Sequence, residues 1–500
     1  MKNAFNITTY EQTINTFPEI TYDQFESLTK VKTRREIVKN NKILKTDAYN
    51  RTMTDLRGED GMKEEVFTLA FRKNAAKEYT IIYGIKDKLL ELFGTPITQY
   101  ELDFAEAHFN AQKKKWGNGA FNKTMRQNII DNHGGYIPLE IKAVQDGTPV
   151  KAFEPIMSIK GPGELAAYFE AVLLRIAFQS CVASDGLIIN QLMYEGRIAN
   201  IIDADEFGNR SVINNDHHFD AVEALIVGAG LEKTSNDAAS AVYPQLRSSG
   251  TIAHRYLAAY PTEDAAFLNA VEKSDKIALL IDLIDSYQGI EKAIALKKKY
   301  RAAGKVIAMR LDSGNLLEQA LYALKRQAEE GLIDPTHDKI ILADISTTDD
   351  IEKVEHAVRA AWYNPRDFIH YGLGEMLVAK NKGRSRVSWA FKLTKTDGRN
   401  TGKKSNDMGK IPIPGELNIE ITDTHRTIVQ EDEPVQGKRL LTTVYKNGVL
   451  AYPNNDITYI DTCRKHLIEN FNDITKISVR STKTEEAITE VKEWFDGQSA

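Results

Sequence analysis

The feature that most constrains the fold is an alternation of short apolar runs and longer amphipathic runs between residues 276 and 374. The apolar runs lead to Asp282, Asp312, Asp344 and Gly372, which stand 30, 32 and 28 residues apart. This is the length of one strand followed by one helix, and a repeated strand–helix unit predicts parallel strands covered by helices. The pattern therefore indicates an α/β protein with a barrel-like array of strands.

The repeat gives explicit element boundaries. Predicted strands cover residues 276–281, 306–311, 339–343 and 368–371, with helices at 289–303, 316–330 and 349–362. Two further strands are expected upstream, at residues 199–204 and in the run that ends at Gly250, with a helix at 261–273. The carboxyl ends of parallel barrel strands form the rim where active sites lie. Polar residues at these strand ends are therefore the first candidates for function.

The two ends of the chain have a different pattern. Near the N-terminus we expect a strand at 65–72, a helix at 85–93 and strands at 139–143 and 150–153 around a turn at 146–148. Beyond Lys392 we expect a long loop over 394–415, strands at 416–422 and 439–446, and helices at 461–471 and 483–495. Residues 1–40 are polar and predict a peripheral helical extension. The part beyond Lys392 must pack away from the barrel rim.

Composition excludes several classes of protein. Lys and Arg number 65 against 70 Asp and Glu, so the chain lacks the basic excess of a nucleic-acid binder. No apolar run approaches the ~18 residues of a membrane span, and Met1–Phe17 lacks the pattern of a signal peptide. Cys181 and Cys463 alone make neither a disulfide framework nor a cysteine-based zinc site. We expect a cytoplasmic enzyme without nucleic-acid or membrane partners.

Two carboxylates stand at the ends of neighbouring predicted strands. Asp282 and Asp312 are placed to hold sugar hydroxyls or Mg²⁺, a hard cation that prefers oxygen ligands. The alternative is that each aspartate caps the following helix. Their recurrence at strand ends, with Ser313-Gly314 directly after Asp312, favours the functional interpretation.

Glycines and histidines also follow predicted strands. Gly372 and Gly374 are able to present backbone N–H groups to a phosphate, although a plain tight turn is the alternative. His254 lies at another strand end, where a structural histidine is the alternative. His217 and His218 are adjacent on a predicted helix and do not face the same way, so we assign both to an exposed helix start without a metal.

Aromatic and basic residues complete the candidates. Phe207 and Tyr49 are able to stack on a flat ligand, and Arg210 is able to grip a carboxylate with two hydrogen bonds. Core packing is the alternative for each aromatic. Further basic candidates are Arg72, Arg384, Lys392, Lys403 and Lys404. For the basic run Lys403-Lys404 a solvated loop is the alternative. These residues together indicate a barrel that handles a phosphorylated sugar.

Several strings between about Lys45 and Gly415 resemble the nicotinate phosphoribosyltransferase family, of which nicotinamide phosphoribosyltransferase is a close relative. The similar strings are Thr46-Asp47-Ala48-Tyr49, Glu154-Pro155, Glu170 to Leu174, Glu206-Phe207-Gly208-Asn209-Arg210, Thr234-Ser235-Asn236, Gly250 to His254, Leu280-Ile281-Asp282, Arg310 to Gly314, Phe391-Lys392-Leu393, and Lys404-Ser405 with Lys410 and Pro414-Gly415. They occur in the family's order, which makes a chance match improbable.

The resemblance implies a fold and a reaction. The fold is the type II phosphoribosyltransferase fold, an irregular barrel (residues 161–390) with an α/β sandwich domain built from both chain ends (41–160 with 391–500). The reaction joins nicotinate to phosphoribosyl pyrophosphate, giving nicotinate mononucleotide and pyrophosphate in NAD salvage. ATP is the implied co-substrate, Mg²⁺ the implied cofactor, and a homodimer with shared active sites the implied assembly.

The resemblance also implies a role for each site residue. Phe207 and Tyr49 would sandwich the pyridine ring, Arg210 would pair with its carboxylate, and Ser235 would lie beside it. Asp282 and Asp312 would hold the ribose and Mg²⁺, directly or through water. His254 would carry a phosphoryl group from ATP. The remaining phosphate and pyrophosphate contacts would come from Gly314, Gly372, Gly374, Arg310, Arg72, Arg384 and Lys392, with Tyr49, Arg72, Arg384 and Lys392 shared across the dimer.

Three positions depart from the family pattern. Ser211 replaces a second arginine of nicotinate enzymes, Glu375 replaces a small or hydroxyl residue in the phosphate loop, and Leu283 replaces a common hydroxyl residue. Ser235 favours nicotinate, because the nicotinamide relatives have an aspartate there that would repel a carboxylate. Two alternatives remain: a nicotinamide phosphoribosyltransferase, and a non-catalytic nucleotide-binding regulator.

Overall fold

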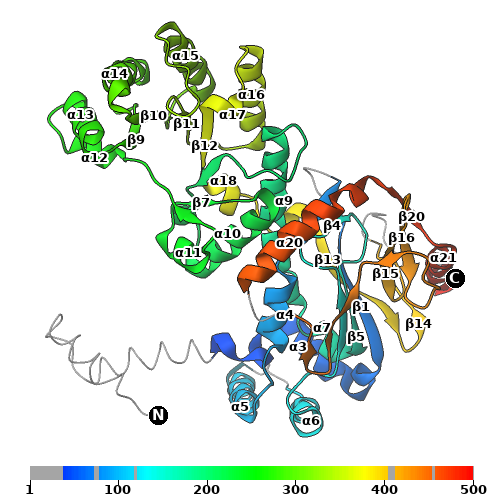
Figure 1. Ribbon diagram of the computed structural model, residues 1–500. Coiled ribbons are helices and arrows are strands. Elements are labelled where there is room, and N and C mark those ends of the chain that lie inside the picture. Colours follow the sequence, from blue (N-terminus) through cyan, green and yellow to red (C-terminus); the bar gives the residue numbers. More distant parts are fainter. Residues whose placement is uncertain (1–37, 73–77, 117–120, 404–410, 453–455, 499–500) are drawn as a thin grey trace, which may run out of the picture.

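The structure is a computed structural model that describes residues 38–72, 78–116, 121–403, 411–452 and 456–498. The helical extension predicted for residues 1–40 falls almost entirely outside the described residues. Within them the chain builds a parallel sheet wrapped by helices and an antiparallel sheet with smaller satellites (Figure 1).

The parallel sheet confirms the predicted strand–helix repeat. Its seven strands lie in the order β8-β7-β6-β12-β11-β10-β9 and form a curled half-barrel, in which the two edge strands, β8 and β9, do not pair with each other in the described part of the chain. The strands are β6 (Ala204–Glu206), β7 (Lys233–Thr234), β8 (Arg247–Ser248), β9 (Lys276–Leu280), β10 (Val306–Leu311), β11 (Ile340–Leu342) and β12 (Ile369–Leu373).

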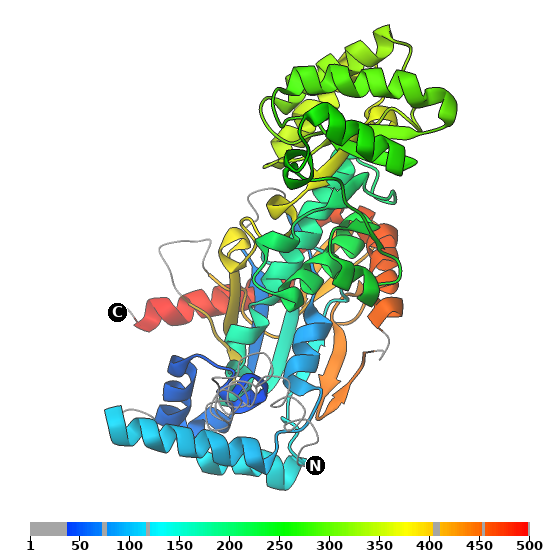
Figure 2. The ribbon, with the colours of Figure 1, turned by 90° about the vertical axis from the view of Figure 1, so that its left-hand side faces the viewer.

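Helices follow the strands of this sheet along the chain, and several of them pack against one of its faces. They are α12 (His254–Ala258), α13 (Glu263–Lys273), α14 (Ser286–Tyr300), α15 (Leu316–Glu329), α16 (Thr348–Ala360) and α17 (Pro365–Phe368). Along β10, Ile307, Met309 and Leu311 are buried, whereas Ala308 and Arg310 are half-buried. Successive strand residues face opposite sides, so Arg310 projects from the face that the helices leave uncovered. Figures 1 and 2 show that β9 to β12 and the helices α12 to α17 project from the rest of the molecule.

The strand expected at residues 199–204 is shorter than predicted, because β6 begins only at Ala204. The preceding residues are held by other contacts: Asn190 donates to the carbonyl of Asn200, and the amide of Ile202 donates to the carbonyl of Ala229. These bonds tie the segment to the ends of α9 (Ile176–Met193) and α10 (Asn215–Ala229). Tertiary hydrogen bonds therefore displace the first part of the predicted strand.

The second large sheet is antiparallel and contains strands from both chain ends. Its order is β14-β13-β1-β5-β3-β18-β19, with β14 (Arg399–Asn400), β13 (Trp389–Thr396), β1 (Glu64–Phe71), β5 (Met157–Pro162), β3 (Glu140–Ala143), β18 (Thr442–Lys446) and β19 (Val449–Leu450). The loop predicted from Thr394 is wrong for residues 394–396 and 399–400. β13 continues to Thr396 because it pairs with β1 as far as Glu65. The predicted domain boundaries themselves stay a prediction.

Smaller elements surround these sheets. A four-stranded sheet contains β17 (Lys438–Arg439), β15 (Leu417–Ile421), β16 (His425–Gln430) and β20 (Ile477–Arg480), and β2 (Tyr79–Ile81) pairs with β4 (Pro149–Lys151). The other helices are α3 (Ala48–Arg57), α4 (Ile85–Phe93), α5 (Gln99–Trp116), α6 (Lys123–His133), α7 (Gly163–Ala167), α8 (Glu170–Leu173), α11 (Asp237–Val242), α18 (Glu375–Val378), α19 (Arg384–Val387), α20 (Asp456–Asn470) and α21 (Thr482–Gln498).

Helix α9 contributes side chains to both large hydrophobic clusters of the molecule, the one around the parallel sheet and the one around the antiparallel sheet. Most of its residues are buried, among them Ala183, against which Gly228 of α10 packs without room for a side chain. No single described helix is long and apolar enough to cross a membrane. The bent pair Gly163–Leu173 and Ile176–Met193 satisfies that criterion when the two helices are counted together.

Candidate active site at the half-barrel rim

A cavity of about 400 Å³ opens at the carboxyl ends of β6, β10, β11 and β12. The predicted repeat places these strand ends together because parallel neighbours end at one edge. The cavity is lined by residues that the sequence analysis singled out: Phe207, Arg210, Ser211, Arg310, Asp312, Gly372, Gly374 and Glu375. Residues more than 160 positions apart in the chain thus meet at one site.

Phe207 is fixed against the β12 loop. Its amide donates to the carbonyl of Leu373 at 2.7 Å. A β-carbon at Gly372 would lie 2.6 Å from Cε2 of the Phe207 ring, closer than van der Waals contact allows. The Arg310 guanidinium lies 5.7 Å from the ring centroid, within the range of a cation–π contact. The ring is therefore held at a defined place in the cavity.

Arg310 also organises the acidic side of the cavity. Its guanidinium donates to Asp312 Oδ1 at 2.8 Å and to the Thr251 hydroxyl at 2.7 Å. These bonds join β10 to the segment that leads into α12. Next to Asp312, Gly314 has a φ of +80°, a left-handed conformation that glycine adopts without strain.

Asp282 and His254 form a second contact at the same rim. The Nε2 atom of His254 lies 3.1 Å from Asp282 Oδ1, and the Ser313 hydroxyl donates to Oδ2 at 2.6 Å. The carboxylate is 3% exposed, whereas the histidine side chain is 51% exposed. Because a carboxylate only accepts, Nε2 carries the hydrogen, and Nδ1 makes no hydrogen bond within the described part of the chain. The ring is thus anchored at one nitrogen and open to solvent.

Asp344 adds a feature that the sequence analysis did not predict. It follows β11, lines the rim cavity and has a φ of +60°, a backbone conformation that costs energy for a residue with a side chain. Glu375 and Lys380 line the same cavity, and Lys380 donates to the carbonyl of Ser346 at 3.2 Å. Acidic and basic groups therefore both line the cavity.

Tyr49 and Arg384 lie in a different cavity of about 640 Å³, between α3, α8 and α19. The Tyr49 hydroxyl donates to Glu170 Oε2 at 2.5 Å, and burial together with this carboxylate raises the pKa of Tyr49 to about 12. The tyrosine stays half-exposed. Within one chain, Tyr49 and Phe207 do not line the same cavity.

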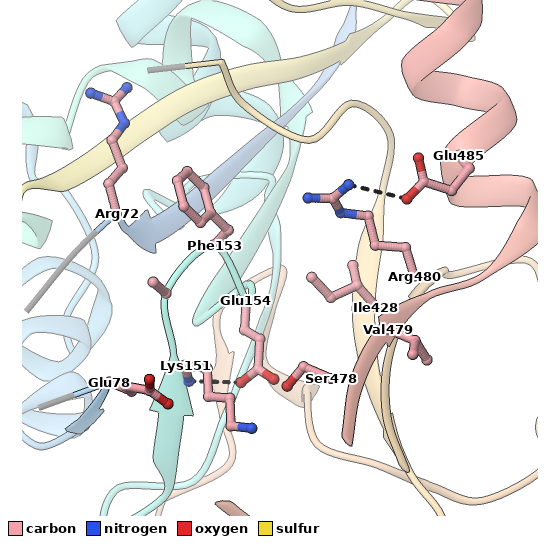
Figure 3. A pocket seen from close by; sticks show the side chains of 11 residues that line it. Arg72, Glu78, Lys151, Phe153, Glu154, Ile428, Ser478, Val479, Arg480 and Glu485 are labelled. Carbon is pink, nitrogen blue, oxygen red and sulfur yellow. Dashed lines mark hydrogen bonds and ion pairs between the residues drawn. The ribbon is translucent and has the colours of Figure 1, made fainter. Parts of the chain in front are cut away.

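Lys392 and Arg72 lie on the antiparallel sheet. Burial lowers the pKa of Lys392, and the neighbouring Arg72, Arg384 and Lys403 lower it further, against the opposing effect of Glu170. Arg72 also borders a cavity of about 580 Å³. Figure 3 shows Arg72 and Phe153 on one side of this cavity and the Arg480–Glu485 ion pair on the other. Arg72, Arg384 and Lys392 thus lie directly after β1, on α19 and on β13, and none of them lines the rim cavity.

The prediction that His217 and His218 form an exposed helix start is wrong for His218. His218 is fully buried, and its Nε2 lies 3.0 Å from Glu206 Oε2. The helix begins at Asn215, so His218 falls on the face of α10 turned toward β6, whereas His217 is half-buried. Glu206 is likewise fully buried. In the sequence, Glu206 was marked only by its place before Phe207 in a string that resembles the family.

The carboxylates of Asp282 and Asp312 suit a cation whose other ligands are waters and phosphate oxygens. Among the described residues there is no group of three or more histidines, cysteines or carboxylates that would hold a metal ion. Asp312 is partly exposed in the cavity, while both oxygens of Asp282 are already hydrogen-bonded. Mg²⁺ keeps several waters and takes one or two carboxylates together with phosphate oxygens. The residues present fit that kind of site.

Ser235 lies beside this cavity rather than in its lining. It follows β7, and its amide donates to the carbonyl of Glu206 at 2.8 Å. Its side chain is exposed. This places Ser235 one strand away from Phe207 and Arg210.

Comparison with curated proteins confirms the resemblance seen in the motifs. The chain is 26% identical over 414 residues to a nicotinate phosphoribosyltransferase of Mycobacterium tuberculosis, covering 81% of each chain. It is 25% identical over 403 residues to that of Bacillus subtilis, covering 79% of this chain and 75% of the relative. A nicotinamide phosphoribosyltransferase of Xanthomonas campestris is 23% identical over 381 residues, covering 68% and 78%. No family model matches the chain.

Two solved structures support the fold. Human nicotinic acid phosphoribosyltransferase superposes with a TM-score of 0.63 over 89% of this chain and 99% of that one, at 15% identity. A nicotinate-nucleotide pyrophosphorylase of Pyrococcus furiosus gives a TM-score of 0.61 over 88% and 97%, also at 15% identity. The type II phosphoribosyltransferase fold is therefore confirmed.

Proposed function

We propose that this protein is a nicotinate phosphoribosyltransferase, which forms nicotinate mononucleotide and pyrophosphate from nicotinate and phosphoribosyl pyrophosphate. The observation that carries the proposal is the rim cavity, where Phe207 lies against Gly372 and where Arg210, Arg310 and Asp312 share one lining. The names of its relatives in Mycobacterium and Bacillus support the same activity.

The residues fit the chemistry of the reaction. The pyridine nitrogen forms a bond to the anomeric carbon of the ribose as the bond to pyrophosphate breaks. The transition state is cation-like at that carbon, so catalysis depends on positioning and on stabilising the leaving anion. Phe207 would stack on the pyridine, and Arg210 would pair with its carboxylate. The backbone of Gly372 and Gly374 would receive the phosphate, as would that of Gly314.

Mg²⁺ would neutralise part of the pyrophosphate charge when bound. Asp312 and Asp282 would hold it, the latter through water, since both Asp282 oxygens already accept hydrogen bonds. The same carboxylates would accept hydrogen bonds from the ribose hydroxyls.

His254 is our proposed phosphoryl carrier. Transfer from ATP would form a bond between Nδ1 and phosphorus and break the bond to the ADP oxygen. The anchored Nε2 and the open Nδ1 support this choice of nitrogen.

Tyr49, Arg72, Arg384 and Lys392 support a homodimer with shared sites. They lie away from the rim cavity of their own chain. A second subunit that brings Tyr49 over Phe207 would complete the aromatic slot, and the basic residues would then meet the phosphates. The site of one chain would be incomplete without its partner.

Nicotinate is favoured over nicotinamide by charge. Ser235 carries no charge that would repel a carboxylate, and Arg210 is exposed in the cavity. The nicotinamide alternative is kept because Ser211 replaces a second arginine and because one curated relative is named for nicotinamide.

The decisive experiment mixes the purified protein with phosphoribosyl pyrophosphate, Mg²⁺ and either nicotinate or nicotinamide, with and without ATP. We expect nicotinate mononucleotide, formed faster with ATP, and little product from nicotinamide. Asp312→Asn is the matched control and should lose most of the turnover. Product from nicotinamide alone would transfer the assignment to the alternative enzyme, and product from neither would leave the non-catalytic regulator.

A further inference from the structure

A buried polar network lies directly beneath the loop that carries Phe207 and Arg210. The Glu206 carboxylate accepts hydrogen bonds from the amide of Gly208, from the Thr234 hydroxyl at 2.7 Å and from His218 Nε2 at 3.0 Å. Neither Glu206 nor His218 is exposed to solvent. A buried carboxylate needs such donors, because burial of an unpaired charge is costly.

The orientation of this network is set by the cap of a neighbouring helix. Asn236 caps α11, and its Oδ1 accepts from the amide of Ala238 at 3.0 Å. Its Nδ2 is therefore the atom that lies 3.0 Å from His218 Nδ1. Because Nδ2 only donates, Nδ1 accepts, and the ring hydrogen is on Nε2, where it faces Glu206. His218 thus donates to Glu206 as a neutral ring.

The network reaches the two segments that we propose for recognition of the pyridine, which are the Phe207–Arg210 loop and Ser235. Asn236 Nδ2 also lies 3.3 Å from Asn209 Oδ1, next to Arg210. The amide of Ser235 donates to the carbonyl of Glu206. A β-carbon at Gly208 would meet Val378 at 2.3 Å, so the loop is also confined from the β12 side. Each of Phe207, Arg210 and Ser235 therefore lies, in the chain, within two residues of a residue that belongs to the network.

We propose that His218 is a positioning residue for pyridine recognition, which acts through Glu206 to hold the Phe207–Arg210 loop in register with Ser235. The inference rests on the proposed function. His218 itself touches no atom of the cavity. Loss of the His218 ring would leave a buried lone pair of Glu206 without a donor. The Glu206 carboxylate, which accepts from the amide of Gly208, would then no longer be held in one orientation.

A merely structural histidine would affect stability and leave substrate discrimination unchanged. A positioning histidine predicts a selective effect on the pyridine. For His218→Ala we expect the KM for nicotinate to rise about tenfold, with kcat and the KM for phosphoribosyl pyrophosphate within about twofold. We also expect the preference for nicotinate over nicotinamide to fall.

The neighbouring histidine offers a matched control. His217 packs on Phe178 and accepts from the amide of Ile213, outside the network. His217→Gln should leave all the constants unchanged. His218→Gln should restore most of the nicotinate affinity, since the Gln amide is able to donate to Glu206 and accept from Asn236. Thr234→Val removes one donor to Glu206 together with the acceptor of the Asn236 amide, and it serves if His218→Ala fails to fold.

Hydrogen exchange tests the positioning independently of turnover. The amides of residues 206–211 should exchange faster in His218→Ala, or in Thr234→Val, than in the wild type or in His217→Gln. Unchanged exchange there overturns the inference, even if the wild type turns over neither pyridine and the proposed function fails. An equal rise in the KM of both substrates, or no rescue by glutamine, overturns it as well.

Discussion

At the scale of single residues, the site depends on two close approaches. Gly372 leaves room for the Phe207 ring, and Asp282 anchors one nitrogen of His254. The sequence placed all four residues at strand ends, but a sequence gives no distances. Glu375 departs from the family pattern, and nothing in the structure explains it. Its side chain lines the rim cavity, where its negative charge would repel a phosphate.

Gly372→Ala should damage the aromatic slot. The added methyl group would overlap Phe207 Cε2, so the ring must move, and we expect kcat/KM for nicotinate to fall about tenfold or more. Steady-state kinetics measure this effect. Gly497→Ala, where a β-carbon meets nothing within 4 Å, is the control. Equal kinetics in the two variants would contradict the proposed place of the pyridine.

His254→Ala should separate phosphoryl transfer from the ribosyl reaction. We expect loss of ATP stimulation with slow ATP-independent turnover retained, because the pyridine slot does not include His254. Product formation with and without ATP measures it. Undiminished stimulation by ATP would remove the carrier role.

At the scale of elements, the hydrophobic period predicted strands and helices that pack into two large hydrophobic clusters. The strand at 306–311 and the helix at 85–93 have the predicted bounds. The errors fall where another element decides the local structure, as at residues 199–203, 394–396 and 399–400. β7 and β8 have two residues each, too few to produce a period.

A buried ionic contact holds α19 and the segment before it. Lys382 and Arg386 both pair with Asp185 of α9. Asp185→Asn would leave two largely buried cations without a counter-charge, and we expect a loss of about 3 kcal/mol or more in the free energy of unfolding. Denaturant titration measures it. Asp216→Asn, which breaks an exposed pair with Lys39, should change that free energy by less than about 1 kcal/mol.

Asp146 links α4 to α20. It accepts from the amides of Ile85 and Lys86 and from the Tyr459 hydroxyl, yet burial raises the pKa of Asp146 to about 7. The folded state therefore binds a proton more tightly than the unfolded chain, whose aspartate has a pKa near 4. The contribution of Asp146 to stability is largest below pH 4 and falls as the pH rises to about 7.

Asp146→Asn removes this titration. We expect the variant to be less destabilised relative to the wild type at pH 8 than at pH 5, as measured by denaturant unfolding at both values. An equal difference at the two pH values would show that Asp146 does not titrate in this range.

At the scale of the whole molecule, the chain crosses twice between its two sheets. β1, β3 and β5 precede the half-barrel in the chain, and β13 and β18 follow it, yet all five strands share one sheet. This arrangement separates Tyr49 and the basic residues of β1, β13 and α19 from the rim cavity of the same chain. The separation supports, at this scale, a site completed by a second subunit.

Mixing two inactive variants tests that assembly. If Tyr49 acts across the interface, Phe207→Ala and Tyr49→Ala chains should each be nearly inactive alone. After subunit exchange, half of the dimers are mixed and each has one intact site, so about a quarter of the wild-type activity should return. No recovery, with exchange verified by mass, would place both residues in one subunit's site.

The amino-acid sequence was enough to predict the alternating strands and helices, the strand-end positions of the acidic, histidine and glycine candidates, and the resemblance to a family. These properties are local, because period, turn chemistry and short motifs involve residues near one another in the chain. Three features emerged from the folded chain: His218 is buried against Glu206, Tyr49 and Phe207 occupy different cavities, and β13 extends past Thr394. Each of these depends on contacts between residues distant in the chain, which no local pattern encodes.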